Sequence, residues 1–356
     1  MPSTLLVPIT KIESIKPHPN ADKLEIAEVL GWQTVIQKDT FKVGDEVLYI
    51  PPDAVLPVEL SDRFGVTQYL SKQRVKQVKL RGEPSFGFVI PVLTAFGMVI
   101  KGLVNDQDNY ADYFGITKYE PPIKIAAGDA APERADFPKY TGIENLRNFP
   151  KILEDGEPVV ITEKIHGTNC RVGIISGELV AGSHGVNRRP PQHPDGKPLD
   201  FADALYSHNI YWSPFALESV RNLLNHLSAN FTQVVLYGEV YGKKIQDLDY
   251  GKTKSELGFA AFDVMIDGIF LPFMSFKDHC EQFGVPIAPV LAFTNYSLDE
   301  VKKHAGGKTT LIADHIREGV VVKPLDERTD PKIGRVVMKY LSDEYLFSDT
   351  SDSKDI

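Results

Sequence analysis

The chain has 356 residues, enough for two domains, and its 42% hydrophobic and 24% charged content is ordinary for a globular protein, which excludes a fibrous or disordered chain. Its formal net charge of -9 excludes a protein that coats nucleic acid nonspecifically, although a local basic face could still bind phosphate. The two cysteines, Cys170 and Cys280, are too few and too far apart for a disulfide framework or a zinc site, so we expect both to be reduced.

The sequence carries no recognisable membrane or export signal. Its first residues, MPSTLLVPITKIESIK, lack a charged leader followed by an apolar core, and no run approaches the roughly 18 apolar residues of a membrane span. We therefore expect a cytoplasmic protein, or a nuclear one in a eukaryote, that does not bind membranes.

The N-terminal third of the chain contains short runs typical of β-strands, separated by turn residues. These runs span residues 5–15, 23–32, 33–37, 45–52, 74–80 and 86–92. They predict a small barrel or sandwich of about five strands.

A segment rich in proline, alanine, glycine and charge lies between residues 116 and 138 and has no clear periodicity. This composition is typical of a linker. We place a first domain at residues 1–120, a linker at 121–134, a second domain at 135–347 and a frayed polar tail at 348–356.

The second domain alternates β-like runs with helical stretches. The β-like runs span residues 158–165, 170–183, 232–242, 257–268, 317–324 and 335–341, and the helical stretches span 215–231 and 273–284. This order predicts an α+β domain with much antiparallel sheet.

The stretch EKIHGTN, residues 163–169, combines an amine, an imidazole and a flexible glycine. A free lysine has a pKa of about 10.4, so only about one molecule in a thousand carries the nucleophilic amine at neutral pH unless burial or nearby positive charge lowers that pKa. The strand-like PVVITEK before the turn-like HGTN puts Lys164 at a strand end facing a cleft. A nucleophile suits that position, but so does a surface lysine before a hairpin turn.

Five segments follow one another in a fixed order in the second domain: EKIHGTN, LYGEVYG, FAAFDV, REGVVVK and RVVMKYLS. This series resembles motifs I, III, IIIa, IV and V of the covalent nucleotidyltransferases, the superfamily of ATP-dependent ligases and mRNA capping enzymes. The resemblance covers essentially the whole second domain.

Three features favour an RNA ligase within that superfamily. His166 stands two residues after the lysine, where DNA ligases and capping enzymes generally have Asp, and KIHGTN with the upstream YTGIENLRN resembles the RNA ligase 2 branch. The sequence ends soon after motif V, so we expect the accessory domain to be the N-terminal one. RVKQVKLRGEPSFGFVIP, after GDEVLYIPPDAVLP, resembles the N-terminal OB module of the RNA ligase 5 family, the Deinococcus-type ligases.

The resemblance implies an α+β chain with an N-terminal OB-fold β-barrel, followed by a nucleotidyltransferase (ATP-grasp-like ligase) domain of antiparallel sheets with flanking helices. It implies an ATP-dependent RNA ligase in which Lys164 takes AMP from ATP and passes it to an RNA 5′-phosphate, from which a 3′-hydroxyl displaces it. We expect Mg²⁺ or Mn²⁺ as cofactor, RNA or a nicked RNA-containing duplex as substrate in RNA repair, and a monomer. The alternatives are a GTP-dependent RNA guanylyltransferase and a noncatalytic tRNA-binding or RNA-binding protein.

The same resemblance implies roles for individual residues. The catalytic set is Lys164, His166, Lys323 and Lys339, and the nucleotide-binding set contains these three lysines together with Glu163, Gly167, Asn169, Arg147, Arg188, Glu239, Phe262 and Glu318. Lysines suit phosphate neutralisation, an aromatic ring suits stacking on adenine, and glycine lets the backbone approach the nucleotide. The metal set is Glu239, Asp263 and Glu318, which would bind directly or through water.

Two departures from the family pattern affect these assignments. Motif V commonly has two lysines separated by one residue, but here Lys339 stands alone, with Val337 or Leu341 at the other position. Motif Ia usually has an arginine soon after a serine, whereas His184 stands there, and we favour Arg188 for that role.

Several of these residues also have a purely structural interpretation. Arg147, a candidate for the ATP tail by its position upstream of motif I, could be a solvated helix arginine. Without the motif context Phe262 would be a core residue, His166 a structural histidine and Asn169 a turn residue.

A basic stretch in the first domain follows PHPNADKLEIAEV, which resembles the opening of tRNA-binding OB modules. We expect five of its residues to contact nucleic-acid phosphates: Lys72, Arg74, Lys76, Lys79 and Arg81. Lys72, Arg74 and Lys76 alternate, so we expect them to share one face of a strand. The alternative is an ordinary edge strand protected by lysine.

Overall fold

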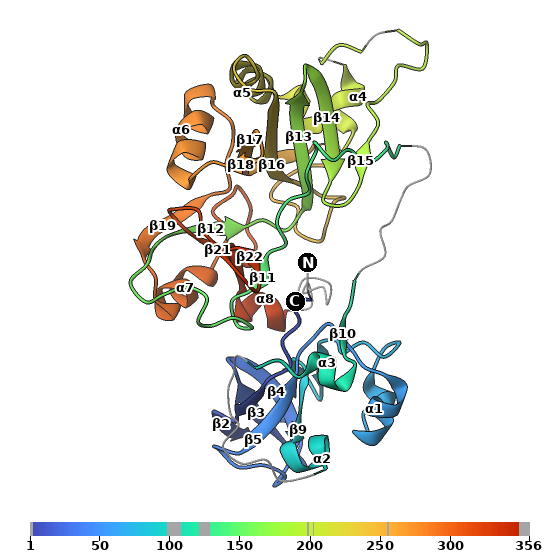
Figure 1. Cartoon of the computed structure of the whole chain (residues 1–356), viewed down its shortest axis with the longest axis vertical. Coiled ribbons are helices and arrows are strands. Elements are labelled where there is room, and N and C mark those ends of the chain that lie inside the picture. Colours follow the sequence, from blue (N-terminus) through green and yellow to red (C-terminus); the bar gives the residue numbers. More distant parts are fainter. Residues whose placement is uncertain are drawn as a thin grey trace. The chain divides into compact units, whose positions relative to one another are not determined.

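The computed structural model describes residues 3–97, 108–120, 129–197, 199–201, 203–254 and 256–348. The chain forms two compact units (Figure 1). The first contains Met1–Pro121, Glu144–Lys151 and Leu346–Ile356, and the second contains Pro122–Ile143 and Ile152–Tyr345. The division expected from the sequence differs in that it assigned 144–151 and residues 346–347 to the second domain. Residues 121–128 of the expected linker and 349–356 of the expected tail lie outside the described residues.

The first unit is built mainly from short antiparallel strands. Its strands are β1 (Ile9–Lys11), β2 (Ser14–Pro17), β3 (Leu24–Val29), β4 (Trp32–Gln37), β5 (Glu46–Ile50), β6 (Ala54–Val55), β7 (Val78–Leu80), β8 (Glu83–Ser85), β9 (Phe88–Pro91), β10 (Thr117–Lys118) and β11 (Glu144–Asn145). Pairing follows the orders β1-β5-β9, β2-β3-β4, β10-β6 and β7-β8. Leu30 and Gly31 join β3 to β4 with φ of 52° and 70°, the two positive values that a tight type I′ hairpin turn requires.

Short helices complete the core of the first unit. They are α1 (Val58–Arg63), η1 (Thr67–Tyr69), α2 (Val92–Phe96) and α3 (Ala111–Phe114). Strand residues Ile9 and Leu48 belong to the same hydrophobic cluster as Leu60, Ala95 and Phe114 from α1, α2 and α3. Strands are present within each of the expected runs, although the run at 74–80 forms a strand only over its last three residues, and the helices between them were not anticipated.

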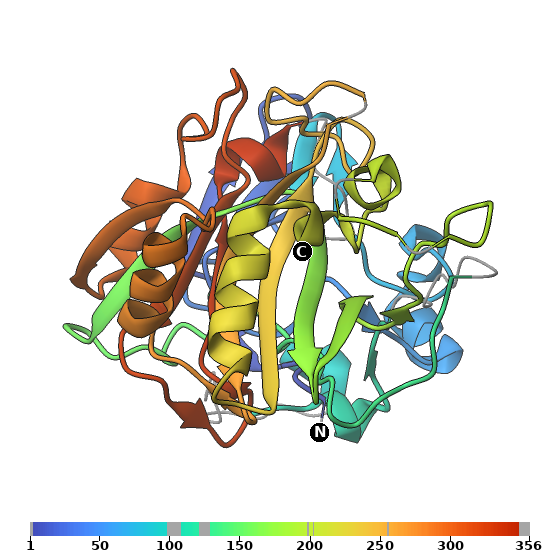
Figure 2. The ribbon, with the colours of Figure 1, turned by 90° about the horizontal axis from the view of Figure 1, so that it is seen from above.

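The described part of the second unit contains two large antiparallel sheets and one two-stranded sheet, with helices packed on the large sheets (Figures 1 and 2). Its strands are β12 (Pro158–Lys164), β13 (Thr168–Ile175), β14 (Glu178–Ser183), β15 (Asn187–Arg188), β16 (Gln233–Tyr241), β17 (Gly258–Ile266), β18 (Ile269–Phe270), β19 (Val290–Asn295), β20 (Gly319–Pro324), β21 (Thr329–Asp330), β22 (Gly334–Arg335) and β23 (Met338–Leu341). One large sheet has the order β15-β14-β13-β16-β17-β18, and in the other large sheet β23, β20, β12 and β19 are consecutive neighbours. This is the α+β arrangement of antiparallel sheets expected from the sequence.

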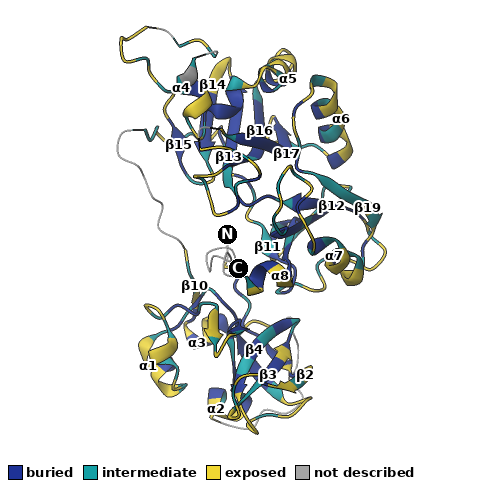
Figure 3. Ribbon diagram, turned by 180° about the vertical axis from the view of Figure 1, so that it is seen from behind, coloured by how far each residue is buried: buried dark blue, intermediate teal, exposed yellow. Residues whose placement is uncertain are grey.

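Helices cover the strands of the second unit. They are α4 (Ala204–His208), η2 (Ser213–Ala216), α5 (Glu218–Ser228), α6 (Phe273–Phe283) and α7 (Leu298–Ala305), and α8 (Asp343–Phe347) falls on the boundary between the units. In α5 the buried residues Val220, Leu223, Leu224 and Leu227 recur at helical spacing, so one face of the helix packs on β13 and β16. Figure 3 shows the result: the strands of the second unit are largely buried, and its helices are exposed along one face.

Candidate active site

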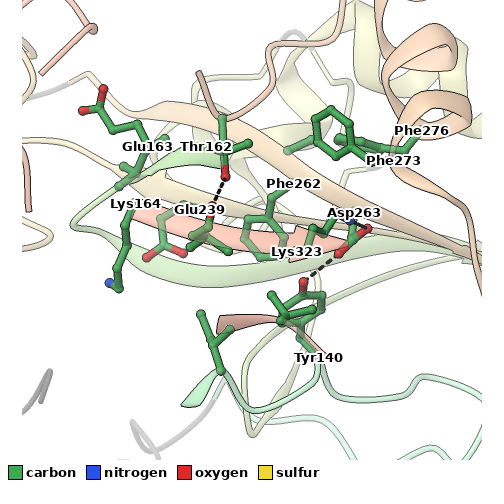
Figure 4. A pocket seen from close by; sticks show the side chains of 16 residues that line it. Tyr140, Thr162, Glu163, Lys164, Glu239, Phe262, Asp263, Phe273, Phe276 and Lys323 are labelled. Atoms are coloured by element: carbon green, nitrogen blue, oxygen red, sulfur yellow. Dashed lines mark hydrogen bonds and ion pairs between the residues drawn. The ribbon is translucent and has the colours of Figure 1, made fainter. Parts of the chain in front are cut away.

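A pocket lies in the second unit, where the end of β12 meets β16, β17 and β20 (Figure 4). Its wall is mainly apolar and includes the rings of Tyr140, Phe262, Phe273 and Phe276. Its polar lining residues are Thr162, Glu163, Lys164, Glu239, Asp263 and Lys323. A mostly apolar cavity with a few convergent polar groups is the usual form of a small-molecule site.

Lys164 is the last residue of β12 and pairs in register with Gly319, the first residue of β20. Its ammonium nitrogen Nζ lies 2.7 Å from Oε1 of Glu318, the fully buried residue before β20. Burial raises the pKa of Glu318, but the nearby Lys164 and His166 lower it more, to about 2. The Glu318 carboxylate is therefore charged at neutral pH, and it stabilises the charged form of the Lys164 amine.

His166 lies beside the carboxylate of this ion pair, and only 3% of the residue is exposed. Its Nδ1 is 3.5 Å from the second carboxylate oxygen of Glu318 and 3.4 Å from the hydroxyl of Tyr345. Its backbone N–H donates to the hydroxyl of Tyr250 over 2.7 Å. His166 is thus held next to Glu318, and it is not one of the residues that line the pocket.

The side chain of Glu163 points away from Lys164, as Figure 4 shows, because neighbouring residues of a strand face opposite sides. Its carboxylate accepts hydrogen bonds from the Thr309 hydroxyl and from the backbone N–H and hydroxyl of Thr310, at 2.8 and 2.7 Å for Thr310. The Arg317 guanidinium lies 3.5 Å away. These contacts make the carboxylate an anchor for the segment before β20, while Glu163 still lines the pocket and its contact with the nucleotide stays a prediction.

Glu239 lines the pocket from β16 and pairs in register with Asn169 of β13. Gly167 stands where a Cβ atom would lie 2.4 Å from the Val240 carbonyl oxygen and 2.9 Å from Cγ of Glu239, so no side chain fits there. Within the described part of the chain, the buried Oδ1 of Asn169 has no hydrogen-bond partner. A ligand hydrogen bond would satisfy this atom.

Phe262 lines the pocket because the pairing of β16 with β17 contains a bulge. Tyr237 pairs with Asp263 and Gly238 pairs with Ala261, so Phe262 is the extra residue between them. A bulge re-aims side chains at that point of a strand. The Phe262 ring packs 4.8 Å from the ring of Tyr140, measured between centroids, and the sequence analysis had not singled out Tyr140.

Asp263 is fully buried and already engaged. One carboxylate oxygen lies 2.7 Å from Nζ of Lys323, and the other accepts from Nη1 of Arg335 at 2.9 Å and from the Tyr140 hydroxyl at 2.6 Å. Burial raises the pKa of Asp263, but Lys323 and Arg335 lower it below its usual value. These contacts give Asp263 the role of holding Lys323 at the pocket wall, and its expected role as a metal ligand stays a prediction.

The two expected phosphate-binding lysines lie on adjacent strands. Lys323 of β20 lines the pocket, but only 6% of its side chain is exposed, and it also lies 3.6 Å from Glu327. Lys339 of β23 pairs in register with Val321, which lines the pocket, so the two residues share that face of the sheet. Val337 also lines the pocket, so an apolar residue occupies one of the two candidate positions for the missing lysine.

The two expected arginines are not among the pocket-lining residues. Arg188 lies 2.6 Å from Asp129, and its guanidinium stacks 4.7 Å from the Tyr211 ring. Arg147 belongs to the first unit, where it donates to the Gly31 carbonyl at 2.7 Å and stacks 5.1 Å from the Trp32 ring. Each of these contacts is sufficient to explain the position of its arginine.

The basic stretch of the first unit is not the continuous strand that was expected. Lys72 and Gln73 have φ of 53° and 64° and form a turn. Arg74 is buried, lies 2.5 Å from Asp53 and stacks 3.7 Å from the Tyr119 ring. The prediction of a shared strand face was therefore wrong.

The other basic residues of this stretch are at least partly exposed to solvent. Lys79, on β7, and Arg81, in the turn between β7 and β8, are exposed, and Lys76 is half-buried. These three residues, together with Lys72, which is exposed in its turn, remain candidates for contact with nucleic acid.

Comparison with known proteins identifies the family. A model described as RNA ligase matches residues 157–341, more than half of the chain, and a model described as an OB-fold domain matches residues 6–92. The chain therefore belongs to the RNA ligase family, with an N-terminal OB-fold domain before its ligase domain. No curated protein matches the sequence significantly.

Solved structures show the same fold. Naegleria gruberi RNA ligase with PPi aligns with a TM-score of 0.67 and 24% identity, covering 96% of this chain and 97% of that chain. A lysine-to-methionine mutant of that ligase with AMP and Mn aligns with a TM-score of 0.69 and 24% identity, covering 96% and 98%. Among the described residues, no helix has both the length and the apolar character needed to cross a membrane.

Proposed function

We propose that this RNA ligase activates RNA ends with ATP through a covalent AMP adduct on Lys164. The observation that carries the proposal is the position of the Lys164 amine, which lines the pocket at a strand end beside Glu318. In the first step a bond forms between Nζ and the α-phosphorus, the bond to pyrophosphate breaks, and the amine loses a proton. Support comes from the Naegleria gruberi ligase, whose structures contain PPi, AMP with Mn, or ATP with Mn.

AMP would then pass to an RNA 5′-phosphate, and a 3′-hydroxyl would displace it to seal the strand. Each step is a displacement at a crowded anion, so positioned cations contribute more than acids and bases. Lys323 and Lys339 would supply positive charge on the pocket face of β20 and β23. The Phe262 ring would stack on adenine, with Tyr140 packed behind it.

Glu239 and Glu318 are the carboxylates that would hold a divalent ion directly or through water. Among the described residues no group of three His, Cys, Asp or Glu side chains could form a metal site alone. Such a pair fits an ion that keeps most of its ligands as water and phosphate oxygens, as Mg²⁺ commonly does. When bound, the ion would neutralise negative charge on the phosphates.

We further propose that the chain is a member of the RNA ligase 5 family, related to the RNA ligase 2 branch, and that it repairs nicks in RNA-containing duplexes. The supporting features are the His-Gly motif after Lys164 and an OB-fold domain at the N-terminus. Lys79 and Arg81 would contribute phosphate contacts on that domain.

The first test is labelling of the full chain with α-labelled ATP, or with α-labelled GTP, in the presence of Mg²⁺ or Mn²⁺. We expect a covalent adduct from ATP that survives a denaturing gel, and none in Lys164→Ala or Lys164→Arg, since guanidinium does not deprotonate near neutral pH. Labelling by GTP alone would favour a guanylyltransferase, and no labelling would favour a noncatalytic RNA-binding protein. Retained labelling in either variant would place the nucleophile elsewhere.

A further inference from the structure

Tyr250 lies in the connection between β16 and β17, outside the five motif segments of the second domain. Its side chain is buried, with 3% of the residue exposed, and its hydroxyl accepts the backbone N–H of His166 at 2.7 Å. His166 is two residues from Lys164, in the turn that joins β12 to β13. The Tyr250 side chain thus contacts the turn that follows Lys164, but it does not line the pocket.

The backbone at Tyr250 is held in an unfavourable conformation. Its φ is 50°, a left-handed value that bulky side chains rarely adopt. Such conformations persist where the surrounding structure imposes them, and they concentrate at functional sites. The next residue, Gly251, has φ of 71°, and a Cβ atom there would lie 2.2 Å from the Ile312 carbonyl oxygen.

The segment of residues 307–317 imposes this conformation from one side. It packs the His315 ring edge-on to the Tyr250 ring, with centroids 4.6 Å apart, and its Ile312 carbonyl closes over Gly251. The same segment binds the Glu163 carboxylate through Thr309 and Thr310. Residues 307–317 therefore hold Glu163, the residue before Lys164, by direct contact. They hold His166, two residues after Lys164, through Tyr250.

We propose that Tyr250 is a positioning residue that fixes the His166 turn and thereby aims the Lys164 amine at the pocket. This inference rests on the proposed role of Lys164 as the nucleophile. A 1 Å displacement of a reacting group can cost about a hundredfold in rate, so a buried acceptor that holds the turn beside Lys164 can have a direct effect on chemistry. Ground-state binding of ATP, which would use other residues, should not depend on it.

The test is Tyr250→Phe, which keeps the ring and removes the acceptor of the His166 N–H. The matched control is Tyr241→Phe, a buried tyrosine packed 5.2 Å from the Tyr250 ring, for whose hydroxyl no hydrogen bond exists among the described residues. We expect Tyr250→Phe to slow covalent AMP formation at saturating ATP by about tenfold, with the KM for ATP within about twofold of wild type. Tyr241→Phe should keep the wild-type rate.

Gly251→Ala provides a second variant that leaves the Tyr250 hydroxyl in place. Its Cβ would displace the backbone at Ile312, so we expect a rate loss of the same kind. A wild-type rate in Tyr250→Phe, an equal loss in Tyr241→Phe, or a raised KM at an unchanged rate would each overturn the positioning role. A wild-type chain that forms no adduct would overturn the proposed function itself, which distinguishes the two failures.

Discussion

Replacing Asp263 by Asn separates a structural role of this carboxylate from a role as metal ligand. The substitution keeps the shape of the side chain and removes one negative charge from a fully buried site. Lys323 then keeps Glu327 at 3.6 Å, and Arg335 keeps Glu327 at 2.5 Å. Removing one partner of a buried ion pair costs about 3 to 5 kcal/mol, and the remaining partner favours the lower value, about 3 kcal/mol.

This loss is measurable as a change in thermal stability. For a folding unit of roughly 200 residues, 1 kcal/mol shifts Tm by about 2 to 4 °C, so Asp263→Asn should lower the Tm of the second unit by about 6 to 12 °C. Because the pKa of Asp263 is held below its usual value, its contribution is present above the ordinary carboxyl pKa and is lost as the pH falls below it. The Tm difference between wild type and variant should therefore shrink in acid.

The same variant tests the metal-ligand alternative. In our interpretation the Mn²⁺ concentration that gives half-maximal adduct formation stays at the wild-type value in Asp263→Asn, even where the rate falls because Lys323 has moved. Glu327→Gln is the matched control, since it removes a partly exposed carboxylate from the same two cations and should cost less. An unchanged Tm combined with a strongly raised Mn²⁺ requirement would refute this reasoning and restore Asp263 as a ligand.

Three other predictions concern the pocket, the core of the first unit and its exposed basic residues. Lys339→Ala and Glu318→Gln should each lower adduct formation and sealing by at least about tenfold with normal circular dichroism, and wild-type turnover in either would show that motif V or IV has been misassigned. Arg74→Ala should destabilise the first unit by about 3 kcal/mol in urea unfolding, because it leaves Asp53 without its buried cation. Neutralising Lys79 and Arg81 together should weaken RNA sealing at low salt, leave adduct formation intact and lose its effect as salt rises; equal sealing at low salt would remove these residues from the RNA surface.

The sequence was sufficient to predict the strands that carry the motifs. PVVITEK reads as a strand and HGTN as a turn from residue types alone, and the structure ends β12 at Lys164 and begins β13 at Thr168. Both properties are local, because β-branched residues favour strands and glycine with asparagine favours turns. Strand alternation could also have shown that Glu163 faces away from Lys164, a signal that the motif comparison obscured.

Non-local contacts account for what the sequence did not predict. The bulge at Phe262 depends on the register between β16 and β17, and the capture of Asp263 by Arg335 joins residues 72 positions apart. Arg74 is a similar case, since Asp53, its partner, lies 21 positions away. An alternating basic run has the same pattern whether it forms a strand or a turn with one buried arginine, so only tertiary structure separates the two.

The contact between Lys164 and Glu318 bears on the nucleophilic role that we propose for this lysine. A nucleophile must be the neutral amine, whereas a carboxylate 2.7 Å away stabilises the ammonium form. Glu318 cannot be neutralised by protonation near pH 7, because its pKa is lowered to about 2, so its charge must be balanced by a cation. His166, at 3.5 Å, contributes only when it is protonated. A cation that arrives with the triphosphate can compete with Lys164 for Glu318. Because the carboxylate is buried, a cation that binds it weakens the ion pair between Glu318 and Lys164. Arrival of the substrate would therefore also release the amine that attacks it.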